Sequence, residues 1–92
     1  MALKRELSSL DNQANFRKTL GKHLRYKREE LNLSQEKFAW DAGLDDKNFG
    51  KIERGVKGPS IRTLYKLRHT HNLSIDQLLD DVKAELEQEG DD

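Results

Sequence analysis

Residues 33–55 read LSQEKFAWDAGLDDKNFGKIERG, and this stretch decides the fold. Ser34 is a typical N-cap residue, because its hydroxyl accepts hydrogen bonds from the free amides at the start of a helix. The apolar residues after it fall on one helical face, namely Phe38, Ala39 and Ala42. Gly43 stands where a helix ends on a residue that tolerates positive φ. The pattern predicts a short helix followed by a glycine turn.

A second short helix follows this turn and is predicted to end at Gly55. Asp45 or Asp46 caps its start, and Phe49 and Ile52 lie on its buried side. Cationic side chains fall on the opposite side, namely Lys47, Lys51 and Arg54. Two short helices joined through a glycine form a helix-turn-helix. We therefore interpret the cationic stripe as a surface for a DNA groove rather than as an ordinary solvated face.

Further amphipathic segments surround this motif. Apolar spacing predicts a helix from about Phe16 to Asn32, whose exposed cations we interpret as a solvated face with ends near phosphates: Arg17, Lys18, Lys22 and Arg25. Ser60 caps another helix, whose inward-facing residues are Ile61, Leu64, Leu67 and Thr70 or His71. Ser74 and Gln77 have the form of a capping box, and the helix that they begin carries the apolar stripe Ile75, Leu79, Val82 and Leu86.

The chain resembles the Cro/Xre, or lambda-repressor-like, family of helix-turn-helix DNA-binding domains. The resemblance lies in the runs Leu-Ser-Gln, Phe-Ala, Ala-Gly-Leu and Ile-Glu-Arg-Gly, then Pro59-Ser60, and continues through Leu64, Leu67 and Ser74 to Leu79. It implies an all-α, compact five-helix domain over residues 16–82. Residues 1–15 would form an N-terminal arm or short helix, and residues 83–92 an acidic C-terminal extension.

The resemblance also implies a function, which is sequence-specific binding of double-stranded DNA by a transcriptional regulator, expected to be a repressor. Its third helix, residues 46–54, would enter the major groove. We expect base contacts from Asp46, Lys47, Asn48 and Lys51. We expect phosphate contacts from Gln35, Arg54, Lys57 and Ser60.

Two residues depart from the family pattern or add to it. Asp46 stands where the family often has a basic or uncharged polar residue, so helix capping is its alternative role. Gly50 lies inside the third helix at a cost of about 1 kcal/mol relative to Ala, and we expect it to let the backbone approach DNA closely.

The resemblance further suggests that Glu53 pairs with Arg28 as a structural ion pair, which suits a carboxylate that is partly buried.

A homodimer is expected, because one short helix contacts too few base pairs to define a specific site. In a palindromic operator, the second copy binds a second half-site of the same sequence. The stripe Ile75, Leu79, Val82 and Leu86 is longer than a small domain needs, so we predict that it forms the dimer interface. In the alternative, its first residues close the core of one chain while Val82 and Leu86 lie over the N-terminal leucines.

The charges divide unevenly along the chain, although 17 Lys and Arg balance 17 Asp and Glu overall. Residues 1–75 hold 16 Lys and Arg against 9 Asp and Glu, a net charge of +7. Residues 76–92 hold 1 against 8, a net charge of −7. A basic body with an acidic C-terminal end suits a protein that binds a polyanion and turns this end away from it. In the alternative, the acidic end only makes the chain more soluble.

Other classes of function find little support in the composition. The chain has no cysteine, no apolar run of about 20 residues and no signal peptide, so we expect a cytoplasmic protein without a membrane segment. His69 and His71 point to opposite sides of a helix and do not share a metal. No catalytic or nucleotide-binding motif is present, so we expect no enzyme, metal or cofactor.

A second hypothesis assigns the chain to a different class of function. In this hypothesis it is a protein-interaction module, such as an antitoxin or a bridging protein. Trp40 lies off the buried side of its helix and is expected to be partly exposed. Cover from the N-terminal leucines is one reason for such a Trp, and contact with a protein partner is the other. Loss of binding with added salt favours DNA, whereas a partner that is insensitive to salt favours a protein.

Overall fold

The structure is a computed structural model of the 92-residue chain, and it describes residues 12–90, with side chains through residue 88. Within this range the chain forms five helices and no strand: α2 (Gln13–Glu30), α3 (Gln35–Asp41), α4 (Asp46–Glu53), α5 (Ile61–His71) and α6 (Ile75–Gly90). The predicted all-α class is therefore confirmed. The arm or short helix predicted for residues 1–15 lies outside the described residues, except that residues 13–15 begin α2.

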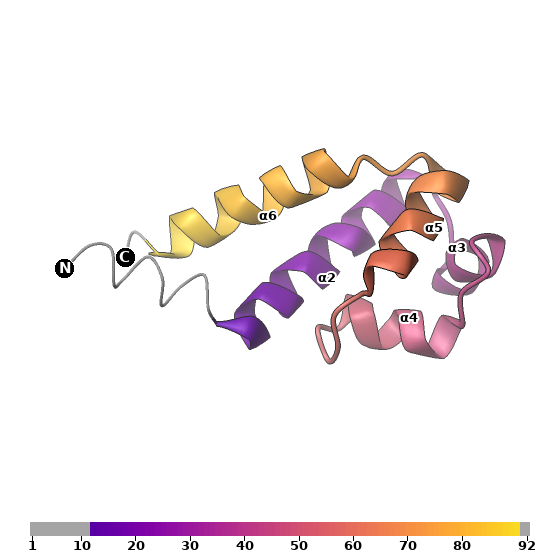
Figure 1. The fold of residues 1–92 in the computed structure, drawn as a ribbon, viewed down its shortest axis with the longest axis horizontal. Coiled ribbons are helices and arrows are strands. Elements are labelled where there is room, and N and C mark those ends of the chain that lie inside the picture. The colour runs from indigo at the N-terminus through magenta and orange to yellow at the C-terminus, as the bar shows by residue number, and fades with distance from the viewer. Residues whose placement is uncertain (1–11, 91–92) are drawn as a thin grey trace.

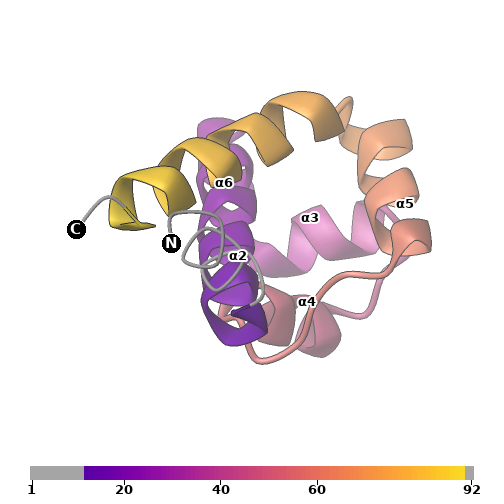
Figure 2. The same ribbon diagram turned by 60° about the vertical axis from the view of Figure 1, so that its left-hand side comes forward.

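The two longest helices, α2 and α6, lie side by side, and the three shorter helices pack at one end of this pair (Figure 1). Figure 1 shows α6 above α2 and α4 below it, and Figure 2 shows the same helices turned so that α6 crosses α2 in the view. Both views place the turn after α4 beside the beginning of α2. Among the described residues, no helix is both long and apolar enough to span a membrane.

Short polar side chains begin the helices, as local sequence predicts. The hydroxyls of Ser34 and Ser60 accept from the backbone amides three residues later at 3.0 Å in both helices. At α4 the cap is Asp45, whose carboxylate accepts from the Asn48 amide at 2.9 Å, so Asp46 is the first helical residue. Helix α2 starts earlier than the expected Phe16 because Asn12 caps it.

Only half of the predicted capping box forms at α6. Ser74 accepts from the Gln77 amide at 3.1 Å. The Gln77 side chain does not return to Ser74 but donates to Asp81 at 2.8 Å, one turn further along the helix.

Two glycines allow α2 and the helix-turn-helix to approach closely. Gly55 ends α4 with φ of +78°, and a Cβ there would lie 2.7 Å from the Lys18 Cα. A Cβ at Gly21 would lie 2.3 Å from the Ile52 carbonyl oxygen. Any larger side chain at either position would push α4 and its following turn away from α2.

The core joins all five helices. Its fully buried large side chains are Phe38, Phe49, Leu24, Leu67, Leu78 and Val82. His71 turns inward from the end of α5, and its ring stacks on Phe38 at 4.0 Å between centroids. Its Nε2 lies 2.8 Å from the Phe38 carbonyl oxygen, so His71 links α5 to α3.

Helix α6 continues unbroken past residue 83, where the acidic extension was expected to begin, and it packs on α2. Val82 is 2% exposed and Leu86 5% exposed within the single chain, whereas Leu79 is 44% exposed. These two buried side chains are covered without a second copy, so the reason for assigning them to a dimer interface no longer holds.

Ion pairs between α2 and α6 flank the buried stripe. Lys22 pairs with Glu85, and the His23 Nε2 lies 3.0 Å from the same carboxylate. Lys27 lies 3.5 Å from Asp81. Hydrogen bonding from Lys22, and then from His23, lowers the pKa of Glu85, while hydrogen bonding from Gln77 and the charge of Lys27 lower the pKa of Asp81. Lys22 was interpreted as part of a solvated face, but it is part of the contact with α6.

Candidate nucleic-acid interface

The sequence placed four base-contacting residues on the helix that the structure defines as α4. One side of α4 is buried and contains Phe49, Gly50, Ile52 and Glu53. The side chains of Lys47, Asn48 and Lys51 are exposed on the other side, whereas Asp46 is half-buried at the first helical position. Three of the four expected side chains therefore reach solvent together along one surface of α4.

Glu53 holds the end of α4 to α2. Arg28 binds it through two parallel hydrogen bonds, from Nε to Oε2 at 2.7 Å and from Nη2 to Oε1 at 3.1 Å. A third guanidinium bond runs from Nη1 to the Leu33 carbonyl oxygen at 2.8 Å. Hydrogen bonding to Glu53 raises the pKa of Arg28, which therefore stays charged. The two side chains that were expected to pair meet in the two-bond geometry that favours an Arg–carboxylate pair.

Gln35 makes an additional contact that sequence reasoning did not anticipate. Its Nε2 donates to Glu53 Oε1 at 2.8 Å, so one carboxylate joins α2, α3 and α4. This bond holds the Gln35 side chain at the junction of α3 and α4 and uses one of its two amide hydrogens. The phosphate contact expected of Gln35 would have to use the other hydrogen.

The position of Gly50 has a different explanation from the one expected. A Cβ at residue 50 would lie 3.2 Å from Arg54 Nη1 and 3.3 Å from Gln35 Oε1. The backbone at this point is buried, so it does not lie open for close approach to DNA. Gly50 instead leaves room for the side chains of Gln35 and Arg54 to fold over the end of α4.

A shallow hollow separates the beginning of α4 from the beginning of α5. Its polar lining consists of Asp45, Asn48, Lys57, Ser60 and Thr63. The structure thus brings together, around one hollow, three residues that were expected to contact DNA: Asn48, Lys57 and Ser60. The Ser60 hydroxyl is already engaged, because it accepts from the Thr63 amide and donates to Thr63 Oγ1 at 3.0 Å.

Among the described residues, the paired Lys and Arg side chains lie mainly on α2, and those without a carboxylate partner lie at the beginning of α2, on α4 and its following turn, and on α5. Within residues 12–90, the Lys and Arg residues in ion pairs are Lys22, Arg25, Lys27, Arg28, Lys37 and Lys83. The cations of α4 and its following turn, which are Lys47, Lys51, Arg54 and Lys57, belong to none of these pairs. No carboxylate among the described residues forms an ion pair with these four side chains. A surface that binds a polyanion needs positive charge that is free in this way.

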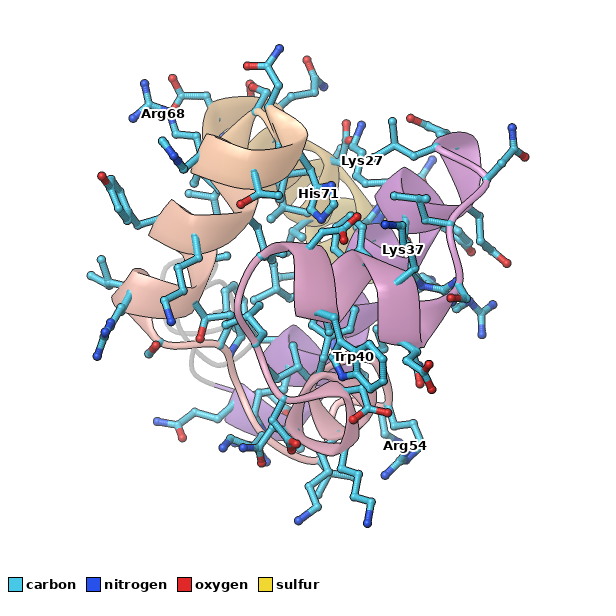
Figure 3. The ribbon with its side chains drawn as sticks, turned by 90° about the vertical axis from the view of Figure 1, so that its right-hand side faces the viewer. Lys27, Lys37, Trp40, Arg54, Arg68 and His71 are labelled. Carbon is cyan, nitrogen blue, oxygen red and sulfur yellow. The ribbon has the colours of Figure 1, made fainter. Side chains whose placement is uncertain are left out.

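Trp40 lies on the outer side of α3, as Figure 3 shows together with Lys37 and Arg54. The side chain is 60% exposed. The leucines expected to cover it precede residue 12 and lie outside the described residues. Sequence reasoning anticipated the exposure of Trp40 because its position is off the buried side of α3.

With this geometry established, comparison with known protein families identifies one that is described as a helix-turn-helix domain and matches residues 21–83. The chain belongs to this Cro/Xre-like helix-turn-helix family. The match begins in the third turn of α2 and ends inside α6, so it spans the whole of α3, α4 and α5. No curated protein matches the chain.

Proposed function

We propose that the protein is a sequence-specific DNA-binding regulator of transcription that places α4 in the major groove and acts as a repressor. The observation that carries this proposal is the cluster of unpaired cations on α4 and its following turn, in a chain that belongs to a helix-turn-helix family. In this proposal the regulator is not an enzyme and works in the cytoplasm.

In this proposal the exposed side of α4 reads bases. Lys47 and Lys51 suit guanine, whose O6 and N7 are both acceptors, and Asn48 suits adenine. Asp46 would accept from the cytosine amino group, but its half-buried position leaves it less reach than the other three. Each good pairing contributes about 1 to 3 kcal/mol of discrimination against the wrong base.

Phosphate contacts in this proposal surround α4. Arg54 and the Gln35 side-chain oxygen lie together over Gly50, and the second amide hydrogen of Gln35 is left to donate to a phosphate. Lys57 and the beginning of α5 at Ser60 lie at the hollow on the other flank of the motif. Contacts of this type fix the register of a protein on DNA without reading its sequence.

Selection of bound sequences from a random duplex pool tests the proposal. We expect an enriched palindrome, because two copies would bind related half-sites. Lys47→Ala and Lys51→Ala should bind the selected duplex more weakly and lose preference at one position in each half-site. Lys83→Ala is the matched control, since Lys83 pairs with Glu87 on α6 at 3.9 Å. A pool without enrichment, or two α4 variants with wild-type affinity and preference, would contradict the proposal.

The exposed Trp40 supports a second candidate function, which is binding of a protein partner as in an antitoxin or bridging protein. An exposed aromatic side chain of this size is typical of protein contacts. Trp40→Ala separates the two functions, because it should weaken a protein complex while leaving the affinity for the selected duplex unchanged. A complex that resists added salt and forms without DNA would favour this candidate.

A further inference from the structure

We propose that the beginning of α2, through Arg17 and Lys18, forms a phosphate-binding site together with Lys57 in the turn after α4. This site extends the DNA contact beyond α4, and the inference rests on the DNA-binding function proposed above. The family match begins at residue 21, so it assigns no role to Arg17 or Lys18.

The first observation is the close packing of α2 on the turn that carries Lys57. Arg17 Nε donates to the Gly55 carbonyl oxygen at 3.4 Å, and its Cγ and Cδ lie 3.8 Å from the position of a Cβ at Gly58. The Lys18 backbone is so close to Gly55 that a Cβ there would lie 2.7 Å from the Lys18 Cα. Arg17 and Lys18 therefore flank the same turn as Lys57.

The second observation is that these two cations differ from the others on α2. Helix α2 contains six Lys and Arg, and four of them meet carboxylates: Lys22, Arg25, Lys27 and Arg28. Arg17 and Lys18 meet none within the described residues, and the first turn of α2 has no acidic residue. The interpretation of one solvated cationic face on this helix was therefore too simple, because only the cations at its beginning lack a carboxylate partner in the part of the chain that the structure describes.

The chemistry of this cluster fits a phosphate group. The Arg17 guanidinium uses only Nε on a carbonyl oxygen, which leaves both terminal amino groups to donate to an anion. Lys18 and Lys57 are exposed, so their ammonium groups can reach the same strand of a DNA backbone. Because α2 is anchored to α4 by Gly21 and by the Arg28–Glu53 pair, these cations are held in a fixed position relative to α4.

The test compares the salt dependence of DNA binding for Lys18→Gln, Arg17→Gln and the double variant, on a duplex that the wild type binds. Each lost phosphate contact should lower the slope of log K against log salt by about 0.9, which corresponds to about eightfold weaker binding at 0.1 M salt. The loss should be equal on selected and random duplexes, because phosphates carry no sequence information. Arg25→Gln is the matched control, since it removes the same charge from α2 at a residue paired with Glu29 at 3.8 Å.

The outcomes separate this inference from the proposed function. If the wild type binds no duplex, the proposed function fails, and this inference with it. If the wild type binds and Lys18→Gln and the double variant keep its affinity and salt slope, only this inference fails. Arg17→Gln also removes a bond to Gly55, so melting curves must accompany it. Lys18→Gln removes no bond between described residues and therefore tests the site without that complication.

Discussion

At the residue scale, Glu53 is the side chain on which the position of α4 depends most. Its side chain is 2% exposed and accepts from Arg28 and Gln35, which belong to two other helices. A buried carboxylate without such donors would be strongly destabilising, because its desolvation would not be compensated. The three contacts together explain why an acidic residue is tolerated near a surface that we propose for DNA.

We predict that Glu53→Gln lowers the free energy of unfolding by about 3 kcal/mol, since it leaves the Arg28 charge largely buried and unpaired. Urea denaturation at pH 7 measures the effect. Glu29→Gln is the control, because its exposed pair with Arg25 contributes less than about 0.5 kcal/mol. Equal stabilities for the two variants would mean that the Arg28–Glu53 pair does not hold α4 in place.

The sequence allowed Arg28 and Glu53 to be paired by resemblance, but it gave no sign of the bond from Gln35. Which side chain covers Gly50 depends on how α3 crosses α4, and no local pattern in the sequence specifies that crossing. Arg17 and Lys18 were not distinguished from the other cations of the predicted solvated face for a similar reason. Their lack of carboxylate partners becomes visible only when the partners of the other cations on α2 are known.

At the scale of elements, the starts of the helices were the most predictable feature. Three helices are capped by a serine hydroxyl that accepts from the amide three residues later, namely at Ser34, Ser60 and Ser74. Such caps can be predicted because both partners lie within four consecutive residues. The partner of the α6 stripe was not predictable in this way. The spacing of Val82 and Leu86 shows which face of α6 is buried, but the helix that covers it is far away in sequence.

The attachment of α6 to α2 should depend on acid pH. Glu85 and Asp81 both have a lowered pKa in the folded chain, Glu85 first through its hydrogen bond from Lys22, and Asp81 first through its hydrogen bond from Gln77 and then through the charge of Lys27. A carboxylate with a lowered folded pKa contributes stability above its unfolded pKa, and this contribution is lost as pH falls through the folded pKa. The stability from these pairs should thus be complete at pH 7 and decline below about pH 4.5.

Glu85→Gln tests this dependence in urea denaturation at pH values from 7 to 3. The variant should be less stable than the wild type at pH 7, and the difference should shrink toward pH 3 as the wild-type carboxylate is protonated. Glu87→Gln, which removes an exposed carboxylate 3.9 Å from Lys83, should follow the wild-type curve. A constant difference between Glu85→Gln and the wild type across this range would show that the carboxylate charge is not the cause.

At the scale of the whole molecule, the arrangement of helices keeps the acidic C-terminal residues apart from the basic residues on α4. The acidic residues after position 75 lie largely on α6, and α6 packs on a different side of α2 from α4 (Figure 1). The acidic residues therefore do not neutralise the unpaired cations on α4. A net charge near zero for the whole chain is compatible with a strongly basic local surface, and only the fold reveals where each charge lies.

The homodimer stays a prediction, and the structure changes where its contact is best sought. Val82 and Leu86 are buried within the single chain, so an interface is better sought on α5. Ile61, which the sequence placed on the inward side of this helix, is 85% exposed, and Tyr65 is 62% exposed. They stand four residues apart on one face of α5. The beginning of α5 shares a hollow with the beginning of α4, so a two-fold contact there would keep two α4 helices close enough for adjacent half-sites.

We therefore predict that the wild type sediments as a dimer at micromolar concentration and that the Ile61→Glu, Tyr65→Glu double variant sediments as a folded monomer. Both side chains are largely exposed, so the substitutions should remove the contact without disturbing the core. Leu79→Glu is the control, because Leu79 is the exposed member of the original α6 stripe. If Leu79→Glu alone yields monomers, the contact lies on α6 after all, whereas a monomeric wild type would exclude a stable homodimer in the absence of DNA. The monomeric variant should also bind a single half-site as well as the wild type does, since the α4 surface is unchanged, and should lose only the added affinity for the full palindrome.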